Sequence, residues 1–194
     1  MNYSRRVKPE PLAVLFAVFS IFYPVFAVIS IRTVGPVPVV VILCVILLLR
    51  IFVPSMRKKL GFLTWGLLAA VVGVAGIAAF DAQLSVRLYP VLINAAMFVS
   101  FAVTLIHPPS MIEMFTRITE PDLPPAGVAY TRKVTLVWVG FFALNGAIAL
   151  FTVVAGSWTV WMVYNGFISY VAAGCLFLVE FLVRQRVRGS EAEA

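Results

Sequence analysis

Two long apolar runs, separated only by Gly156 and Ser157, make up most of the last third of the sequence. Residues 131–155 and 158–183 are each long enough for an α-helix that crosses a bilayer, which takes about 20 apolar residues. Basic residues precede the first run and follow the second, so both basic clusters lie on the same side of the membrane. The pattern predicts a helical hairpin in lipid, and lipid is then the solvent for the rest of the chain.

The composition extends this prediction to the whole chain. Of its 194 residues, 62% are hydrophobic and only 12% are charged, whereas about 25% of the residues of soluble domains are charged. Too few polar side chains remain to cover a soluble surface. We therefore predict an all-α polytopic membrane protein. The net charge of +7 then reflects the orientation of the chain in the membrane. It also indicates anionic lipid, rather than nucleic acid, as a partner.

The apolar segments predict one transmembrane domain over residues 11–188, between a basic tail (1–10) and a short tail (189–194). It is a bundle of six transmembrane helices, at about 11–30, 38–53, 60–80, 88–107, 131–155 and 158–183. Two further segments are predicted between these spans. Residues 81–87 form a polar turn, and apolar residues at helical spacing from Met111 to Ile118 form a short amphipathic helix in the cytoplasmic interface.

Lys and Arg residues are distributed unevenly between the two sides of this predicted bundle. Thirteen fall on the side of the two termini and only two, Arg32 and Arg87, on the other. The positive-inside rule therefore places both termini in the cytoplasm. Trp158 and Trp161 then lie at the outer boundary of the membrane, and Trp65 and Trp138 lie near the inner one.

Small residues suggest how the helices pack. The third span is rich in Gly and Ala, which let helices approach closely in lipid, so we predict that it is the central packing helix. The triplet Tyr-Pro-Val occurs at 23–25 and 89–91, which raises an inverted repeat as an alternative organisation. Cys44 and Cys175 lie in apolar runs without metal-ligand spacing, and we expect no disulfide between them.

Polar residues inside the spans are costly and are the candidates for a site. In the outer half they share one predicted depth, with Arg87 near the boundary; they are Tyr23, Asn94, Asn145, Tyr164 and Asn165. Two interpretations are open. The residues form a ligand-binding pocket, or they form interhelical hydrogen bonds worth about 0.6 kcal/mol each. Packing is the more economical interpretation.

A second polar group lies in the inner half and consists of Arg50, His107, Glu180 and Arg184. Glu180 precedes Arg184 by one turn, which predicts an intrahelical ion pair. These residues are candidates for a lipid-headgroup site or a proton relay, although charged side chains at helix ends also extend to the interface without a special role.

Motifs for catalysis are absent from the sequence. His107 is the only histidine, and there is no zinc-binding, nucleophile-elbow or phosphate-loop motif. We predict no catalytic residue, no metal and no cofactor, and we disfavour an enzyme.

Several features from Tyr89 onward form a pattern. They are a fourth span led by Tyr89-Pro90, then Leu123-Pro124-Pro125, a basic pair before Trp138 and Asn145, then Trp161 and a final span that ends in basic residues. This pattern resembles the intracellular septation protein A family of bacterial inner-membrane proteins, and also uncharacterised membrane proteins found beside aryl-polyene pigment genes. Tyr164-Asn165-Gly166 stands where that family has a Phe-Lys-containing stretch, which indicates a sister family.

Three functions are expected on these grounds. The resemblance implies a non-enzymatic, multi-pass protein of the bacterial inner membrane that supports cell-envelope biogenesis or integrity, with membrane lipids (anionic on the cytoplasmic face) and envelope proteins as partners. The alternative is a small transporter or flippase for an amphipathic or lipid-linked substrate, with its site in the outer polar layer. The third is a membrane subunit of a lipid or polyene biosynthetic system, with Glu180 or His107 as acid or base. The sequence carries no indication of the oligomeric state.

Overall fold

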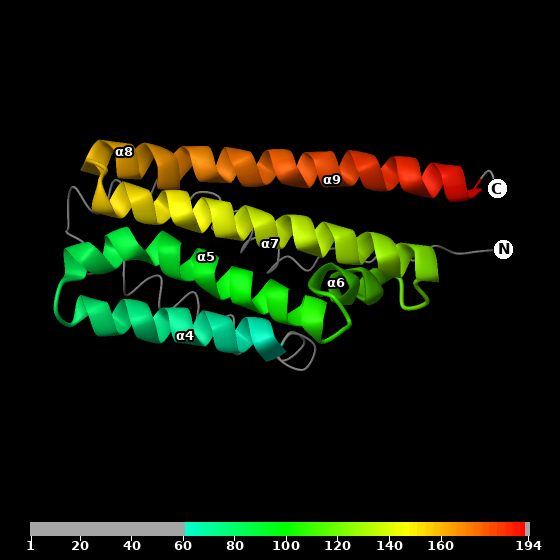
Figure 1. The fold of residues 1–194 in the computed structure, drawn as a ribbon, viewed down its shortest axis with the longest axis horizontal. Helices are drawn as coiled ribbons and strands as arrows, with labels where there is room; N and C mark the ends of the chain where they lie inside the picture. Colours follow the sequence, from blue (N-terminus) through cyan, green and yellow to red (C-terminus); the bar gives the residue numbers. More distant parts are fainter. Residues whose placement is uncertain (1–60, 193–194) are drawn as a thin grey trace, which may run out of the picture.

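The computed structural model describes residues 61–192, and every regular element in this part of the chain is helical (Figure 1). The elements are α4 (Gly61–Ala78), α5 (Ala82–Ile106), α6 (Met111–Thr119), α7 (Pro125–Val154), α8 (Trp158–Val163), the π-helical turn η1 (Tyr164–Ile168) and α9 (Ser169–Ala192). The predictions for the tail 1–10, the spans 11–30 and 38–53, Tyr23, Arg50, Cys44 and the repeated triplet involve residues outside this range.

Three stretches are long and apolar enough to cross a membrane: Ala82–Ile106, Pro125–Val154 and Trp158–Arg186. A shorter apolar helical stretch, Trp65–Ala78, lies within α4. These helices agree with the predicted all-α class and with the last three predicted spans. The predicted total of six also depends on residues outside the described part.

The long helices lie side by side in the order α4, α5, α7 and α8–α9 (Figure 1). The closest packing joins α5 to α4 and to α7, so α5 is the central helix of the described bundle. The short helix α6 packs against α7 near the C-terminus of α5 (Figure 1). We name the two ends of the bundle the α6 end and the Gly156 end, after the turn between α7 and α8.

Each end of the bundle has its own apolar core. Phe101, Met111, Val134 and Trp138 form the core at the α6 end. The other core consists of Val74, Val86 and Trp161. Both clusters combine residues from different helices, so burial of these side chains holds the helices in register at two separate levels.

Two of the tryptophans pack inside the bundle. Trp138 and Trp161 are only 5% and 8% exposed, because they pack into the two cores, whereas Trp65 is 73% exposed. The depth of the four tryptophans at the membrane boundaries stays a prediction, and the two buried rings also stabilise the cores.

Small residues bring α4 close to α5, as expected of a packing helix, but within residues 61–192 the central position predicted for this segment belongs to α5. A Cβ atom placed on Gly66 would lie 2.6 Å from Ser100 Oγ and 3.1 Å from the backbone oxygen of Ala96. The second distance matters more, because a backbone oxygen cannot rotate away as a hydroxyl can. Glycine at position 66 thus permits the close approach of the two helices.

The predicted polar turn at 81–87 is wrong, because α5 already begins at Ala82. The Asp81 carboxylate accepts a hydrogen bond from Leu84 N (2.9 Å) and thereby caps the first turn of the helix. Two further helices extend beyond one of their predicted ends. Helix α7 begins at Pro125 rather than near 131, and α9 continues to Ala192, through most of the predicted tail.

The predicted short helix between the fourth and fifth spans is present as α6, but its faces are arranged differently. Glu113 and Thr116 are buried, whereas Phe115 and Ile118 are 37% and 56% exposed. The reason is that the start of α6 is fixed to its neighbours by buried hydroxyl groups. Thr104 Oγ1 accepts a hydrogen bond from Met111 N at 3.0 Å, and a threonine of α7 binds the next amide in the same way.

Candidate functional site

A chain of hydrogen bonds joins three helices near the middle of the bundle. Tyr164 in η1 donates to Asn145 Oδ1 (2.8 Å), and Asn145 Nδ2 donates to Asn94 Oδ1 (3.0 Å). Asn94 Nδ2 in turn donates to the backbone oxygen of Pro90 (2.7 Å). Because a carbonyl oxygen can only accept, Pro90 sets the orientation of both amides and hence the direction of the whole chain.

Glycine next to Asn145 makes this contact between α5 and α7 close. A Cβ atom on Gly146 would lie 3.1 Å from Asn94 Cβ. The Asn145-Gly146 pair therefore supplies both the polar group and the space that it needs. A side chain at position 146 would push Asn94 away from its partner.

The third asparagine is held separately, near the C-terminus of α7. Asn165 Nδ2 donates to Thr152 Oγ1 and to the backbone oxygen of Trp161, both at 3.0 Å. The Thr152 hydroxyl donates its own hydrogen to Ala149 O (2.7 Å), so it is free to accept from Asn165. Both amide hydrogens of Asn165 are thus used, and its Oδ1 makes no hydrogen bond with residues 61–192.

Arg87 closes the Gly156 end of the same region. Its Nη2 donates to the backbone oxygens of Thr152 (2.9 Å) and Gly156 (2.8 Å), so the guanidinium caps the C-terminus of α7. The guanidinium carbon lies 5.6 Å from the centre of the Trp158 ring, and Trp161 Nε1 donates to Arg87 O at 3.0 Å. Within the described residues Arg87 makes no ion pair. Its role here is to hold α5, α7 and α8 together.

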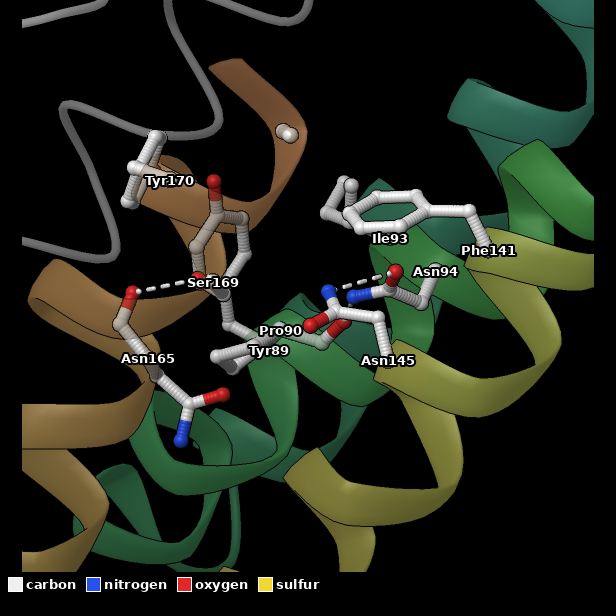
Figure 2. A pocket seen from close by; sticks show the side chains of 10 residues that line it. Tyr89, Pro90, Ile93, Asn94, Phe141, Asn145, Asn165, Ser169 and Tyr170 are labelled. Carbon is white, nitrogen blue, oxygen red and sulfur yellow. Dashed lines mark hydrogen bonds between the residues drawn. The ribbon is translucent and has the colours of Figure 1, made fainter. Parts of the chain in front are cut away.

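A cavity of about 160 Å³ lies between the Asn94–Asn145 pair and Asn165. Figure 2 shows Asn94 and Asn145 facing each other from α5 and α7, with Asn165 on the helix opposite. The lining combines these amides with aromatic and small side chains: Tyr89, Pro90, Ile93, Asn94, Phe141, Asn145, Asn165, Ser169, Tyr170 and Ala173. Phe141 packs against the core at the α6 end and Tyr89 against the other core, so the cavity lies between the two.

Two irregular helix segments border the cavity. Pro90 lies inside α5, where it has no N–H for the helical bond to Val86 O. On the other side, η1 is a π-helical turn from Tyr164 to Ile168, a geometry that is rare and often found at functional sites. The wider turn directs two consecutive residues, Tyr164 and Asn165, to partners on α7.

The chemistry available in this cavity is neutral hydrogen bonding. Within residues 61–192, no Asp, Glu, Lys, Arg, His or Cys lines the cavity. It offers amide and hydroxyl groups at the edge of an apolar wall, which suits binding and orientation rather than nucleophilic or acid–base chemistry. Among residues 61–192 no cluster of His, Cys, Asp and Glu has the geometry of a metal site.

The structure brings together all of the predicted outer polar residues that it describes. Asn94, Asn145 and Tyr164 are directly bonded, Asn165 lies across the cavity, and Arg87 connects through Thr152. Ligand binding by these residues stays a prediction.

The inner polar residues do not form a common site. Arg184 pairs with Glu120 (3.9 Å) and not with Glu180, so the predicted intrahelical ion pair is wrong. The Glu180 backbone oxygen accepts from Tyr130 Oη (3.3 Å), whereas His107 is exposed at the end of α5. Between residues 61 and 192 no hydrogen bond or ion pair joins His107 to Glu180.

Three residues of the site were not singled out from the sequence: Thr152, Ser169 and Tyr170. Two of them carry a periodicity signal. Thr152 follows Asn145 by two helical turns, and Ser169 follows Asn165 by one turn and donates to its backbone oxygen (3.3 Å). Tyr170 carries no comparable signal, and Tyr89 was noted only for its place in the repeated triplet and at the start of the fourth span.

Comparisons with protein-family models, with curated proteins and with solved structures find nothing that matches this chain. The resemblance to the septation protein A family therefore stays a prediction, and a function must be argued from the geometry of the site.

Proposed function

We propose that the protein is a multi-pass inner-membrane protein, with cytoplasmic termini, that binds an amphipathic molecule in the asparagine-lined cavity. This places it in the class of small transporters and flippases. The observation that supports the proposal is a cavity of about 160 Å³ bordered by three asparagines in helices that are otherwise apolar. Polar groups at such depth are costly, and they commonly mark a ligand pathway.

Packing alone accounts for only part of the arrangement. The Tyr164–Asn145–Asn94 chain gives each of its members a partner and would serve packing well. Helix interfaces optimised for packing leave few voids larger than a water molecule, yet a cavity remains beside this chain. Asn165 adds an acceptor that no described residue uses.

The two irregular segments support movement as well as binding. Pro90 and η1 lie on opposite sides of the cavity, and each interrupts the regular hydrogen bonding of its helix. Discontinuous helices at a central site are typical of transporters. A change at either segment would open or close the cavity without unfolding the rest of the bundle.

Native mass spectrometry of the protein, extracted gently from its own membrane, tests this proposal. We expect one class of small molecule or lipid to remain bound, and to be lost from the variants Asn94→Leu and Asn165→Leu. Thr135→Val is the matched control, because Thr135 is buried and accepts a hydrogen bond from Ile112 N far from the cavity. Retention of only bulk phospholipid by all forms would contradict binding in the cavity.

A second candidate is the non-enzymatic role in cell-envelope biogenesis, through lipid and protein contacts. The exposed apolar residues of α6, Phe115 and Ile118, favour it, as do the exposed Arg132 and Lys133 at the α6 end of α7. Such residues suit anionic lipid headgroups or an envelope protein. In this case replacing Asn94 and Asn165 by Leu would change stability and leave the envelope function intact.

The biosynthetic-subunit proposal has the least support. It needs Glu180 or His107 as an acid or base, and the described part of the chain does not connect the two. Activity that survives in the double variant Glu180→Gln, His107→Ala would remove this proposal.

A further inference from the structure

The lining of the cavity restricts the charge of what can bind. None of the ten lining residues that the structure describes carries an acidic or basic side chain. A phosphate, carboxylate or ammonium group placed there would have no counter-charge in a low-dielectric environment, where an unpaired charge is strongly disfavoured. The part of a ligand that enters the cavity is therefore neutral.

The hydrogen bonds around the cavity also restrict which polar groups a ligand can carry. Asn165 uses both amide hydrogens on Thr152 and Trp161, and Ser169 Oγ donates back to the Asn165 backbone. Among the described lining residues, Asn165 Oδ1 is left as an acceptor, and Tyr170 Oη and the second Nδ2 hydrogens of Asn94 and Asn145 are left as donors. A hydroxyl group matches this lining because it both donates to Asn165 Oδ1 and accepts from its neighbours.

The size of the cavity limits how much of the ligand it encloses. Its volume is about 160 Å³, and an apolar cavity of about 150 Å³ holds one benzene molecule, or about six heavy atoms. Tyr170, which is 45% exposed, lies at the edge of the cavity. A headgroup of this size would fit inside, with an attached acyl chain leaving past Tyr170 onto the exposed apolar surface of α9, at Val171 and Phe177.

We infer that the cavity takes a neutral, hydroxyl-bearing headgroup of glycerol size, and that Asn165 Oδ1 accepts the hydrogen of its hydroxyl. The inference rests on the proposed function and defines its ligand class. A neutral glycerolipid and a free polyol share this chemistry. The test must therefore separate these two sources as well as separate neutral from anionic headgroups.

The purified full chain in detergent is titrated with four probes, and binding is followed by native mass spectrometry. The relative affinities distinguish a neutral glycerolipid from a free polyol and from an anionic lipid. The four probes are dioctanoylglycerol, the methyl ether of its free hydroxyl, dioctanoyl phosphatidic acid and glycerol. We expect dioctanoylglycerol to bind best, and the methyl ether to bind about tenfold more weakly, the loss expected when a buried acceptor has no partner. We expect Asn165→Leu to lose this preference and Thr135→Val to keep it.

The outcomes distinguish this inference from the proposed function. Tighter Asn165-dependent binding of phosphatidic acid, or equal binding of the methyl ether, would overturn the hydroxyl headgroup but leave a ligand site. Absence of any Asn165-dependent binding would overturn both. Glycerol that binds as tightly as the lipid would support the headgroup chemistry and assign it to a soluble polyol. The comparison of the two glycerolipids uses the unaltered chain, so it decides the question even if Asn165→Leu does not fold.

Discussion

Asn145 on α7 donates a 3.0 Å hydrogen bond to the amide oxygen of Asn94 on α5, across the interface of the two helices that pack most closely. The bond is one link in a directed chain that starts at Tyr164 and ends at Pro90. One interhelical contact thus connects the π-helical turn to the proline in α5, the two irregular segments that border the cavity.

We expect the Asn94–Asn145 contact to be modest in energy. A double-mutant cycle with Asn94→Leu and Asn145→Leu should give a coupling free energy of about 0.6 kcal/mol, the typical value for polar pairs in membrane bundles. The measurement is reversible unfolding in mixed micelles. A coupling above about 3 kcal/mol would contradict the expected strength, and a coupling of zero would show that the pair does not form.

Gly66→Ala should destabilise the α4–α5 contact, because the new Cβ would meet the backbone oxygen of Ala96 at 3.1 Å. The matched control is Gly76→Ala in the same helix, where a Cβ atom would have nothing within 4 Å. At position 76, alanine should raise the free energy of unfolding by up to about 1 kcal/mol, because its helix propensity is higher than that of glycine. Thermal unfolding in detergent compares the two, and equal shifts of the same sign would count against close packing at Gly66.

Thr104→Val should loosen α6 from the bundle. Thr104 is 1% exposed and accepts from Met111 N, so valine would leave that buried amide without a partner, at a cost of about 1–3 kcal/mol. Hydrogen exchange of the α6 peptide should become faster in this variant. Thr119→Val is the control, since Thr119 is exposed and bonds only to Thr116 O within α6. Unchanged protection of α6 in Thr104→Val would show that the hydroxyl does not hold the helix.

Arg87→Lys should weaken the Gly156 end although the charge is kept. Arg87 Nη2 reaches the carbonyl oxygens of Thr152 in α7 and of Gly156 in the turn that follows, while the flat guanidinium faces the Trp158 ring, and lysine lacks this planar group. We expect a lower unfolding temperature together with a change in tryptophan fluorescence. Arg184→Gln is the comparison. Its pair with Glu120 is partly exposed and 3.9 Å long, so its loss should cost at most about 1 kcal/mol.

The sequence predicted the outer polar layer better than the inner polar group, for a physical reason. Depth along a helix follows from residue number at about 1.5 Å per residue, so Asn94, Asn145 and Asn165 were expected at one level. Rotation about each helix axis does not follow from residue number. That Asn165 bonds to Thr152, while Asn145 bonds to Asn94, depends on how the helices pack.

At the α6 end, the spacing of residues within one segment did not identify their partners. The spacing of Glu180 and Arg184 predicted an ion pair, but Glu120, which follows α6, binds Arg184 instead. The predicted amphipathic helix was placed in the interface from the spacing of its apolar residues alone. Glu113 and Thr116 are buried because Thr104 and Thr135, on two other helices, provide acceptors for the first amides of α6. In both cases the deciding partner lies outside the segment whose pattern was used.

Photo-crosslinking in the native membrane tests ligand binding in the cavity most directly. A benzophenone side chain would replace Tyr170, at the edge of the cavity, or Phe167, which is 66% exposed and does not line it. We expect position 170 to capture one class of neutral, hydroxyl-bearing molecule, identified by mass, and to lose that adduct when Asn165→Leu is added. Position 167 should capture bulk phospholipid. The same phospholipid adducts at both positions, unaffected by Asn165→Leu, would contradict a binding site between the asparagines.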